Sequence, residues 1–239
     1  MKSDSFGIYG GKDPRDLSSY TLAEAARYLR LAPATLRSWV VGRQYPRGGD
    51  MAFFSPLIQP PDLSSAQLSF WNLVEAHVLK ALRTKHGVSI KAVRNALDFA
   101  QEALGIDRLF LSRELYTDDQ SLFLDKYGEL LDLSKSGQLA MKIVLEAHLK
   151  RVEWDMQNVP IRLFPFSNIS RSDTIPIREP KVIVIDPFIS FGRPIIERKC
   201  ISTATIVERY DAGESVKHLA DDYDLNAWEI EAIIYERAA

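Results

Sequence analysis

The side chains best suited to recognising another molecule lie between residues 35 and 47. Thr35, Arg37 and Ser38 fall within one short amphipathic stretch, and Arg43 and Arg47 follow it. Arginine can donate two hydrogen bonds to a guanine in the major groove, and hydroxyl groups bind phosphates. These residue types therefore predict binding of double-stranded DNA, provided that they lie on one exposed surface.

The local charge supports this interpretation. From Tyr20 to Asp50 the basic side chains outnumber the acidic ones by three, in a chain whose formal net charge is −2. The charged residues of this segment are Arg27, Arg30, Arg37, Arg43 and Arg47, against Glu24 and Asp50. Positive charge of this kind attracts the phosphate backbone. The alternative is a core helical hairpin whose surface arginines are incidental, and the two short helices alone do not exclude it.

Two short helices would hold these residues. Thr21 and Glu24 have the spacing of a capping box, which predicts that a helix starts at Thr21. Pro33 suits the first position of a second helix, because its fixed backbone angle is helical and its missing N–H would have no acceptor there. The sequence therefore predicts a helix-turn-helix with a tight turn near Leu31 and Ala32.

The second helix determines which side chains face outward. Leu36 and either Trp39 or Val40 have the spacing of a buried face. We therefore expect the side chains at positions 35, 37 and 38 to face away from the core, near the end of the helix that reaches the major groove in such motifs.

This stretch resembles the start of MerR-type winged helix-turn-helix regulators. The resemblance rests on Tyr20-Thr-Leu-x-Glu-Ala-Ala and Pro33-x-Thr-Leu-Arg, and it extends over roughly the first hundred residues. It implies a wing from Arg43 to Pro61 and a further pair of helices, from Leu68 to Arg83 and after residue 89. Ala32 departs from the family, which often has a serine at that position.

A second group of candidate binding residues lies near the C-terminus. Asp221, Asp222 and Asp224 cluster at an expected helix end, and Trp228 follows. The segment from Thr203 to Ala239 contains nine acidic and three basic side chains, so it carries a net charge of minus six. Such a surface repels phosphates and favours contact with a basic protein, for which Trp228 could be an aromatic anchor. The alternative is a solvated acidic surface, with Trp228 covering the core of its own domain.

The C-terminal segment also resembles a known domain. A β-branched run ends at Asp186-Pro187, Gly192-Arg193-Pro194-Ile195-Ile196 follows, and three helices are expected from residue 201 onward. These motifs, with Leu219 to Leu225 and Ala232 to Tyr235, resemble an antitoxin-associated, homeodomain-like domain of unknown function. The chain departs from that domain at Glu197-Arg198-Lys199, where Gly-Thr-Arg is usual.

The rest of the chain completes the expected organisation. We expect a mainly α fold with four parts. They are a flexible N-terminal arm over 1–19, a winged helix-turn-helix over 20–105, a small α+β middle module and linker over 106–177, and a helix-turn-helix-like domain over 178–239. In the middle module, short strands are expected from Leu109 to Leu131, a helix from Gln138 to Trp154, and an extended segment from Ile161.

The sequence gives little support to catalysis. No nucleophile and base pair, paired carboxylates or metal-ligand spacing stands out, and Cys200 is the only cysteine. We therefore expect no cofactor, no metal and no enzymatic activity. The absence of a signal-like start and of a long apolar run predicts a cytoplasmic protein with no membrane partner.

The two resemblances together indicate a function. They are typical of VapB-class antitoxins, whose partner toxins are PIN-domain-like ribonucleases. The resemblance implies that the chain neutralises such a toxin and represses its own operon as a homodimer on operator DNA. The alternative is a stand-alone MerR-like transcriptional regulator whose middle module binds an effector or forms a dimer.

Overall fold

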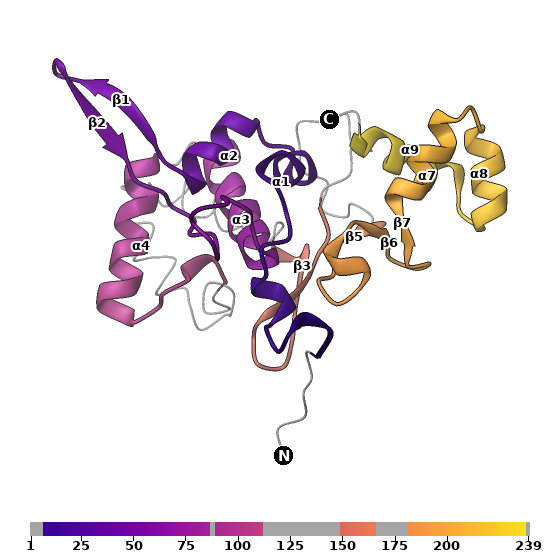
Figure 1. Cartoon of the computed structure of the whole chain (residues 1–239), viewed down its shortest axis with the longest axis horizontal. Coiled ribbons are helices and arrows are strands. Elements are labelled where there is room, and N and C mark those ends of the chain that lie inside the picture. Colours follow the sequence, from indigo (N-terminus) through magenta and orange to yellow (C-terminus); the bar gives the residue numbers. More distant parts are fainter. Residues whose placement is uncertain (1–6, 87–88, 112–148, 166–180, 238–239) are drawn as a thin grey trace.

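The computed structural model describes residues 7–86, 89–111, 149–165 and 181–237 (Figure 1). This part of the chain is mainly helical and contains three small antiparallel sheets. The N-terminal helices and the C-terminal helices form two groups, which Figure 1 shows side by side with strands β3, β5 and β6 between them. The predicted fold class is confirmed.

The helix-turn-helix begins as the sequence predicts. Helix α1 spans Leu22–Leu29, and its capping box is complete: the Thr21 hydroxyl accepts from the Glu24 N–H, and the Glu24 carboxylate accepts from the Thr21 N–H. Arg30 takes a left-handed backbone conformation and ends the helix. Helix α2 spans Pro33–Val40 with the proline at its first turn, and Ala32 gives no side-chain cap. The turn between the helices is therefore as short as expected.

The wing is a two-stranded hairpin. Strand β1 (Arg43–Arg47) pairs antiparallel with β2 (Asp50–Phe54), from Arg43 opposite Phe54 to Arg47 opposite Asp50. Gly48 and Gly49 both have positive φ, which a two-residue hairpin turn of this kind requires. The hairpin projects away from the helices (Figure 1).

Helix α3 (Phe70–His86) is the centre of the larger hydrophobic core. Phe70, Leu73, Val78 and Leu79 are completely buried, and an isolated bridge between Leu68 and Tyr20 joins the start of α3 to that of α1. Helix α4 (Ile90–Leu104) starts at the Ser89 cap and packs by one apolar face into the same core. Because α3 is buried on most sides, it fixes the position of the helix-turn-helix.

Two expectations for the middle segment are wrong. Leu109–Leu111 forms a 3₁₀-helix, η3, rather than a strand, and its first two side chains are buried in the α3 core. Residues 152–154 form strand β3 rather than the end of a helix, because they pair with β4 (Pro160–Leu163). The extended segment expected from Ile161 is present as β4. The other strands expected up to Leu131, most of the helix expected from Gln138, and the linker lie outside the described residues.

Residues 7–19 are packed against the protein, although the sequence predicts a flexible arm. They form two short 3₁₀-helices, η1 (Gly7–Tyr9) and η2 (Pro14–Asp16). Arg15 binds Asp155 at 3.0 Å, and its guanidinium lies over the Trp71 ring. The prediction missed these contacts because each partner is distant in sequence. Residues 1–6 lie outside the described part.

The C-terminal group has its own small core. Strands β5 (Ile183–Val184), β6 (Ile195–Ile196) and β7 (Ile201–Ser202) form one sheet, and the short helix η6 (Ser190–Gly192) lies between β5 and β6. The three helices follow as α7 (Thr203–Asp211), α8 (Val216–Tyr223) and α9 (Ala227–Arg237). They pack around Ile206, Leu219, Ile230 and Ile233.

The two cores are connected through Ile183 in strand β5 and Ile185 just after it. Ile185 pairs with Leu163 of β4 and is buried in the larger core, whereas Ile183 belongs to the C-terminal core. Leu109 and Phe110, beyond the expected end of the first domain at 105, also lie in the larger core. The helix-turn-helix and the C-terminal helices are therefore held in a defined relative position.

Candidate functional sites

The five candidate DNA-binding residues lie on α2 and on the hairpin. Leu36, Trp39 and Val40 are buried, so α2 packs by the face that the sequence predicts. Arg37 is exposed, whereas Thr35 and Ser38 are half-buried. Arg43 and Arg47 are exposed on β1, at its base and near the tip of the hairpin.

A groove between α2 and the hairpin brings three of these residues together. It has a volume of about 380 Å³, and Thr35, Ser38 and Arg43 line it. The other lining residues are Ala34, Trp39, Tyr45, Phe54, Arg83 and Ile90. Two arginines and three hydroxyl groups line this groove, and its described lining includes no carboxylate. It can therefore bind a phosphate. Arg37 and Arg47 lie outside it.

Sequence reasoning missed Tyr45 and Arg83 as residues of this groove. The alternation of side chains along β1 puts Tyr45 on the same face as Arg43, so this signal was available. Arg83 comes from the end of α3, and nothing in the sequence relates it to α2.

The hydroxyl of Ser38 has a more limited role than expected. It donates to the Thr35 carbonyl within the same helix at 2.8 Å, so its proton is already used. Ser38 can accept a hydrogen bond but does not offer a free donor to a phosphate in this conformation. Thr35 is the better hydroxyl donor of the pair.

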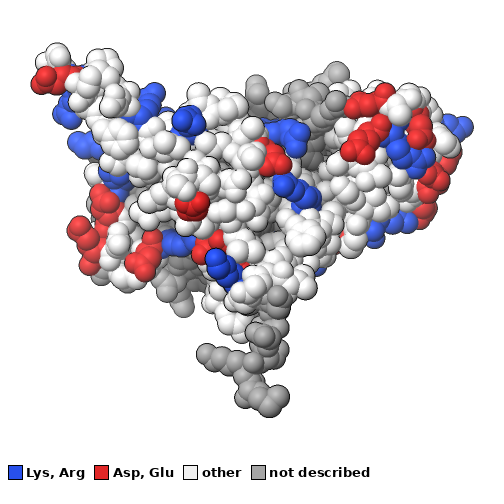
Figure 2. Space-filling view, viewed as in Figure 1, with Lys and Arg blue, Asp and Glu red and all other residues white. Residues whose placement is uncertain are grey.

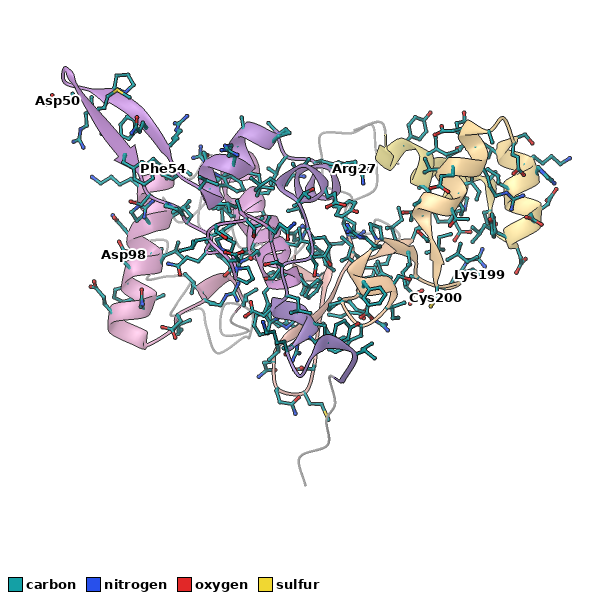
Figure 3. The ribbon with its side chains drawn as sticks, in the orientation of Figure 1. Arg27, Asp50, Phe54, Asp98, Lys199 and Cys200 are labelled. Carbon is teal, nitrogen blue, oxygen red and sulfur yellow. The ribbon has the colours of Figure 1, made fainter. Side chains whose placement is uncertain are left out.

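Arg94 braces the base of the hairpin. Its guanidinium donates to the Ser55 carbonyl at 2.6 Å and lies over the Phe54 ring at 5.2 Å. Figure 3 shows Phe54 at this base and Asp50 at the far tip. The face of the hairpin that carries Arg43 and Tyr45 is therefore held toward α2 and α4.

The acidic cluster near the C-terminus is largely engaged in ion pairs. Asp222 binds Arg209, which also binds Glu214 at 2.6 Å, and Asp224 binds Lys199 at 2.7 Å. The hydrogen bond and charge of Lys199 lower the pKa of Asp224. Two of the three predicted aspartates thus have basic partners within their own domain. Figure 2 shows acidic and basic side chains close together on the surface of the C-terminal helices. The third, Asp221, is exposed and has no ion-pair partner among the described residues.

Trp228 is partly exposed on α9. Its exposed fraction is 40%, and that of Tyr235, seven residues later, is 55%. Residues seven apart lie on the same side of a helix, with Glu231 between them. The structure therefore gives Trp228 a surface that can contact a partner, and it adds Tyr235, which sequence reasoning missed.

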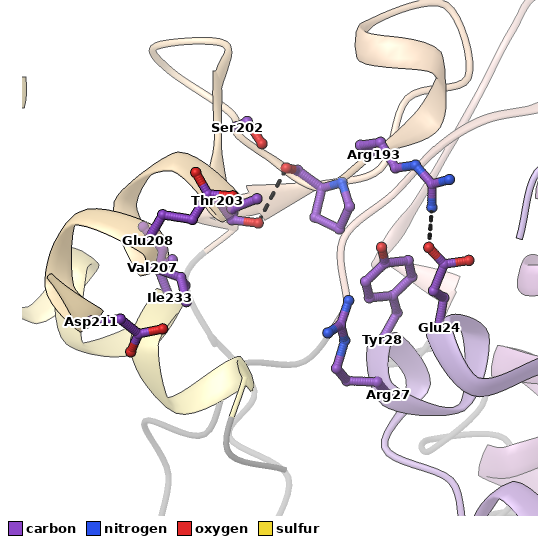
Figure 4. Close-up of a pocket in the computed structure, with 12 residues that line it drawn as sticks. Glu24, Arg27, Tyr28, Arg193, Ser202, Thr203, Val207, Glu208, Asp211 and Ile233 are labelled. Carbon is purple, nitrogen blue, oxygen red and sulfur yellow. Dashed lines mark hydrogen bonds and ion pairs between the residues drawn. The ribbon is translucent and has the colours of Figure 1, made fainter. Parts of the chain in front are cut away.

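A cleft separates the helix-turn-helix from the C-terminal helices (Figure 4). Its volume is about 430 Å³; Arg27 and Tyr28 of α1 lie on one side and Glu208 and Asp211 of α7 on the other. At its rim, Arg193 binds Glu24 at 2.6 Å. The cleft therefore brings charged residues of both groups of helices close together.

A buried hydrogen bond also joins these two groups. The Tyr20 hydroxyl donates to the Gly192 carbonyl at 3.0 Å, and burial raises the pKa of Tyr20. Gly192 has a φ of +73°, and a side chain there would overlap the Tyr20 hydroxyl. Glycine at position 192 is therefore required for the close contact between η6 and Tyr20, which lies just before α1.

The described residues include no cluster of three or more histidine, cysteine or acidic side chains able to hold a metal ion. They also include no helix that is long and apolar enough to span a membrane.

An N-terminal and a C-terminal segment of the chain each match a known sequence family. Residues 18–97 match a family described as "Putative DNA-binding HTH domain", and residues 183–235 match a family described as "Protein of unknown function (DUF433)". A Mycobacterium tuberculosis protein named "Putative antitoxin VapB45" is 29% identical over 224 residues, which cover 87% of this chain and 89% of that protein. The chain is therefore similar to an antitoxin-named protein over most of its length. The resemblance stated from the sequence is thereby confirmed, with both domains present.

A solved structure has a similar fold. The crystal structure of Rv2018 from Mycobacterium tuberculosis superposes with a TM-score of 0.63 and 23% identity. The match covers 92% of this chain and 98% of that one. The similarity therefore extends over the whole arrangement, beyond the helix-turn-helix.

Proposed function

We propose that this chain is a non-catalytic cytoplasmic antitoxin that binds operator DNA through its N-terminal half and a ribonuclease toxin through its C-terminal helices. The proposal rests on two observations taken together. The exposed helix-turn-helix of this chain lies beside a basic groove, and the chain is similar to a protein named as an antitoxin. The VapB resemblance supplies the expectation that the toxin is a PIN-domain-like nuclease.

The DNA-binding part uses α2 and the hairpin. Arg37 contacts base edges in the major groove, while Thr35 and Arg43 donate to a backbone phosphate in the groove beside α2, and Ser38 lines the groove without donating to it. Arg47, near the hairpin tip, contacts a more distant phosphate. Binding of this kind would repress the operon that encodes the chain and its toxin.

A homodimer follows from the same proposal, because specific operators are generally read as two half-sites about one DNA turn apart. The buried face of α3 is not available to a second subunit, since Leu73, Val74 and Leu79 are completely covered within one chain. The dimer contact therefore uses another surface.

The toxin-binding part uses the C-terminal helices. Trp228 provides an aromatic anchor, and Asp221, Asp222 and Asp224 attract a basic partner. Asp222 and Asp224 already form ion pairs within the chain, which partly neutralise their charge. Their effect on toxin binding is therefore smaller than that of an unpaired carboxylate such as Asp221.

The experiment is co-expression with the protein encoded next to this chain's gene, followed by co-purification and a gel-shift with promoter DNA. A stable complex that binds the promoter supports both halves of the proposal. A chain that binds the promoter but no adjacent gene product would favour a stand-alone regulator.

A further inference from the structure

Four large apolar side chains are exposed on three segments that are far apart in the sequence. They are Ile8 in η1 (83% exposed), Met156 in the turn between β3 and β4 (93%), Phe188 just before η6 (44%) and Phe191 within it (71%). Figure 1 shows these segments side by side at the lower edge of the molecule. We call the surface formed by the four side chains the η1–η6 face. Exposed apolar side chains that gather in this way indicate contact with another molecule.

The backbone holds Phe191 in its exposed position. Ser190 and Phe191 have left-handed φ angles of +50° and +52°, which are costly for residues other than glycine. The Tyr9 ring lies edge-on to the Phe191 ring, and the Tyr9 hydroxyl donates to the Pro187 carbonyl at 3.2 Å. On the other side, Gly192 accepts the buried hydrogen bond from the start of α1. Because this turn is fixed in advance, little conformational entropy is lost when a partner covers Phe191.

Arg15 connects η6 to the β3–β4 turn. Its guanidinium lies 5.8 Å from the centre of the Phe188 ring, and it binds Asp155 at 3.0 Å. Asp155 directly precedes Met156 in the turn. The contacts of Tyr9 and of Arg15 therefore make the η1–η6 face one continuous surface.

The charges of residues 12–15 and of the β3–β4 turn balance one another. Arg15 binds Asp13 at 2.6 Å in addition to Asp155, and Lys12 adds a second positive charge, so two basic side chains accompany two acidic ones. A neutral apolar face is poorly suited to DNA or to a strongly basic protein. It can meet its own copy without repulsion between like charges.

We propose that the η1–η6 face is the contact between the two subunits of the homodimer, in which each subunit covers the four apolar side chains of the other. A dimer with two-fold symmetry uses the same self-complementary patch on both subunits, which a neutral apolar face provides. The inference rests on the homodimer of the proposed function and adds to it the surface that joins the subunits.

The exposed area agrees with this assignment. From their exposed fractions, the four side chains leave roughly 500 Å² uncovered in one subunit. Two subunits would thus bury about 1,000 Å² before their polar rim is counted, which is about the lower limit for a specific interface. In Figure 1 the face lies apart from α2, from the β1–β2 hairpin and from α8. A dimer formed there leaves the proposed DNA-binding surface and α8 uncovered.

The test measures the dimer dissociation constant of the full chain by sedimentation equilibrium. Phe191→Asn should weaken the dimer at least about thirtyfold, because it removes an aromatic anchor from both subunits. Asparagine accepts a left-handed backbone better than phenylalanine does, so the turn should keep its conformation. Leu63→Asn is the matched control, because Leu63 is 76% exposed but lies outside the face. Its dissociation constant should equal that of the parent.

A second variant separates loss of the dimer from loss of the fold. Met156 is 93% exposed, so Met156→Lys removes little contact within one chain. In the proposed dimer it places a charge in an apolar contact of each subunit, and it should also shift the chain to monomers. Circular dichroism should show the parent's helix content for both variants.

The outcomes are distinct. A dimeric parent and control, with Phe191→Asn and Met156→Lys both shifted to monomers, support the inference. Variants that dimerise as tightly as the parent overturn it, and the proposed function then stands with a dimer contact elsewhere. Variants that stay dimeric but no longer co-purify with the product of the adjacent gene also overturn it, because the face would then bind the toxin. A parent that is monomeric with and without promoter DNA overturns both this inference and the proposed dimer.

Discussion

Arg193 donates a hydrogen bond at 2.6 Å to Oε1 of Glu24, the carboxylate whose other oxygen caps helix α1. The Glu24 side chain thus caps the start of the first helix of the DNA-binding motif and also forms an ion pair with the C-terminal part of the chain. Burial alone would raise the pKa of Glu24, but hydrogen bonds from Thr21 and the charge of Arg193 outweigh it and lower the pKa.

This pair predicts a pH-dependent stability. Because the folded pKa of Glu24 lies below its ordinary value of about 4.5, its contribution is complete above that pH and is lost as the pH falls through the folded pKa. Glu24→Gln should lower the free energy of unfolding by about 1 to 2 kcal/mol at pH 7, because glutamine keeps an acceptor for the cap but loses the charge that favours the helix start and forms the partly exposed ion pair. Urea denaturation of both proteins from pH 7 to pH 3 measures this difference.

The control for this prediction is Arg193→Gln, which removes the ion pair and keeps the cap. It should lose only part of the stability that Glu24→Gln loses. A difference between parent and Glu24→Gln that stays constant down to pH 3 would show that the carboxylate charge has no role.

Gly192→Ala should destabilise the contact between the two groups of helices. The added methyl group overlaps the hydroxyl of Tyr20, a completely buried side chain, and left-handed backbone costs alanine roughly 1 to 2 kcal/mol. We expect a total loss of about 3 kcal/mol in unfolding free energy, because overpacking adds to the backbone cost.

Gly105→Ala is a matched control for that variant. Gly105 has a similar φ of +68°, and nothing lies within 4 Å of the added Cβ, so only the backbone cost of about 1 kcal/mol should appear. Equal losses in the two variants, measured by denaturation, would mean that the Tyr20 contact is loose enough to accept a side chain.

Two arginines should affect DNA binding in different ways. Arg37→Ala should cost about 1 to 3 kcal/mol on the promoter and reduce the preference for it over random DNA, if Arg37 contacts a base. Arg47→Ala should weaken binding to both DNAs equally and reduce the salt slope by about 1. Fluorescence anisotropy at several salt concentrations measures the affinity for each DNA and the salt slope. If the two variants behave alike, Arg37 and Arg47 do not have the separate roles proposed here.

The proposed dimer predicts a specific stoichiometry. Light scattering at micromolar concentration should give twice the chain mass of 27.1 kDa, with or without promoter DNA. A monomer under both conditions would contradict the half-site interpretation.

The local signals in the sequence predicted the helix-turn-helix well, because they act within a few residues. The spacing of Thr21 and Glu24 and the position of Pro33 each fix backbone geometry directly. The apolar run at Leu109 was misassigned as a strand, since a short apolar run does not distinguish a strand from a buried 3₁₀-turn.

The candidate sites were predicted less completely than the fold. Arg83 enters the α2 groove from a separate helix, and the partners of Asp222 and Asp224 lie up to 25 residues away. The net charge of minus six from Thr203 onward omits Arg198 and Lys199, which lie just before that residue and bind Glu229 and Asp224. These contacts arise from tertiary packing, which one sequence read by periodicity does not reveal.

On the proposed toxin-binding surface, different residues should control the association rate and the dissociation rate. Trp228→Ala should mainly speed dissociation from the toxin, because it removes a contact area. Asp221→Asn should mainly slow association and reduce its dependence on salt, since Asp221 has no ion-pair partner among the described residues. Surface plasmon resonance with the full chain measures both rates. Lys217→Ala is a control on the exposed side of α8 and should leave dissociation unchanged.

The most direct test of the central claim is a ribonuclease assay with the purified product of the adjacent gene. The account predicts that this protein cleaves RNA alone, and that an equimolar amount of the full chain abolishes cleavage while forming a complex on a sizing column. Full cleavage in the presence of excess chain, with no complex, would contradict the antitoxin function.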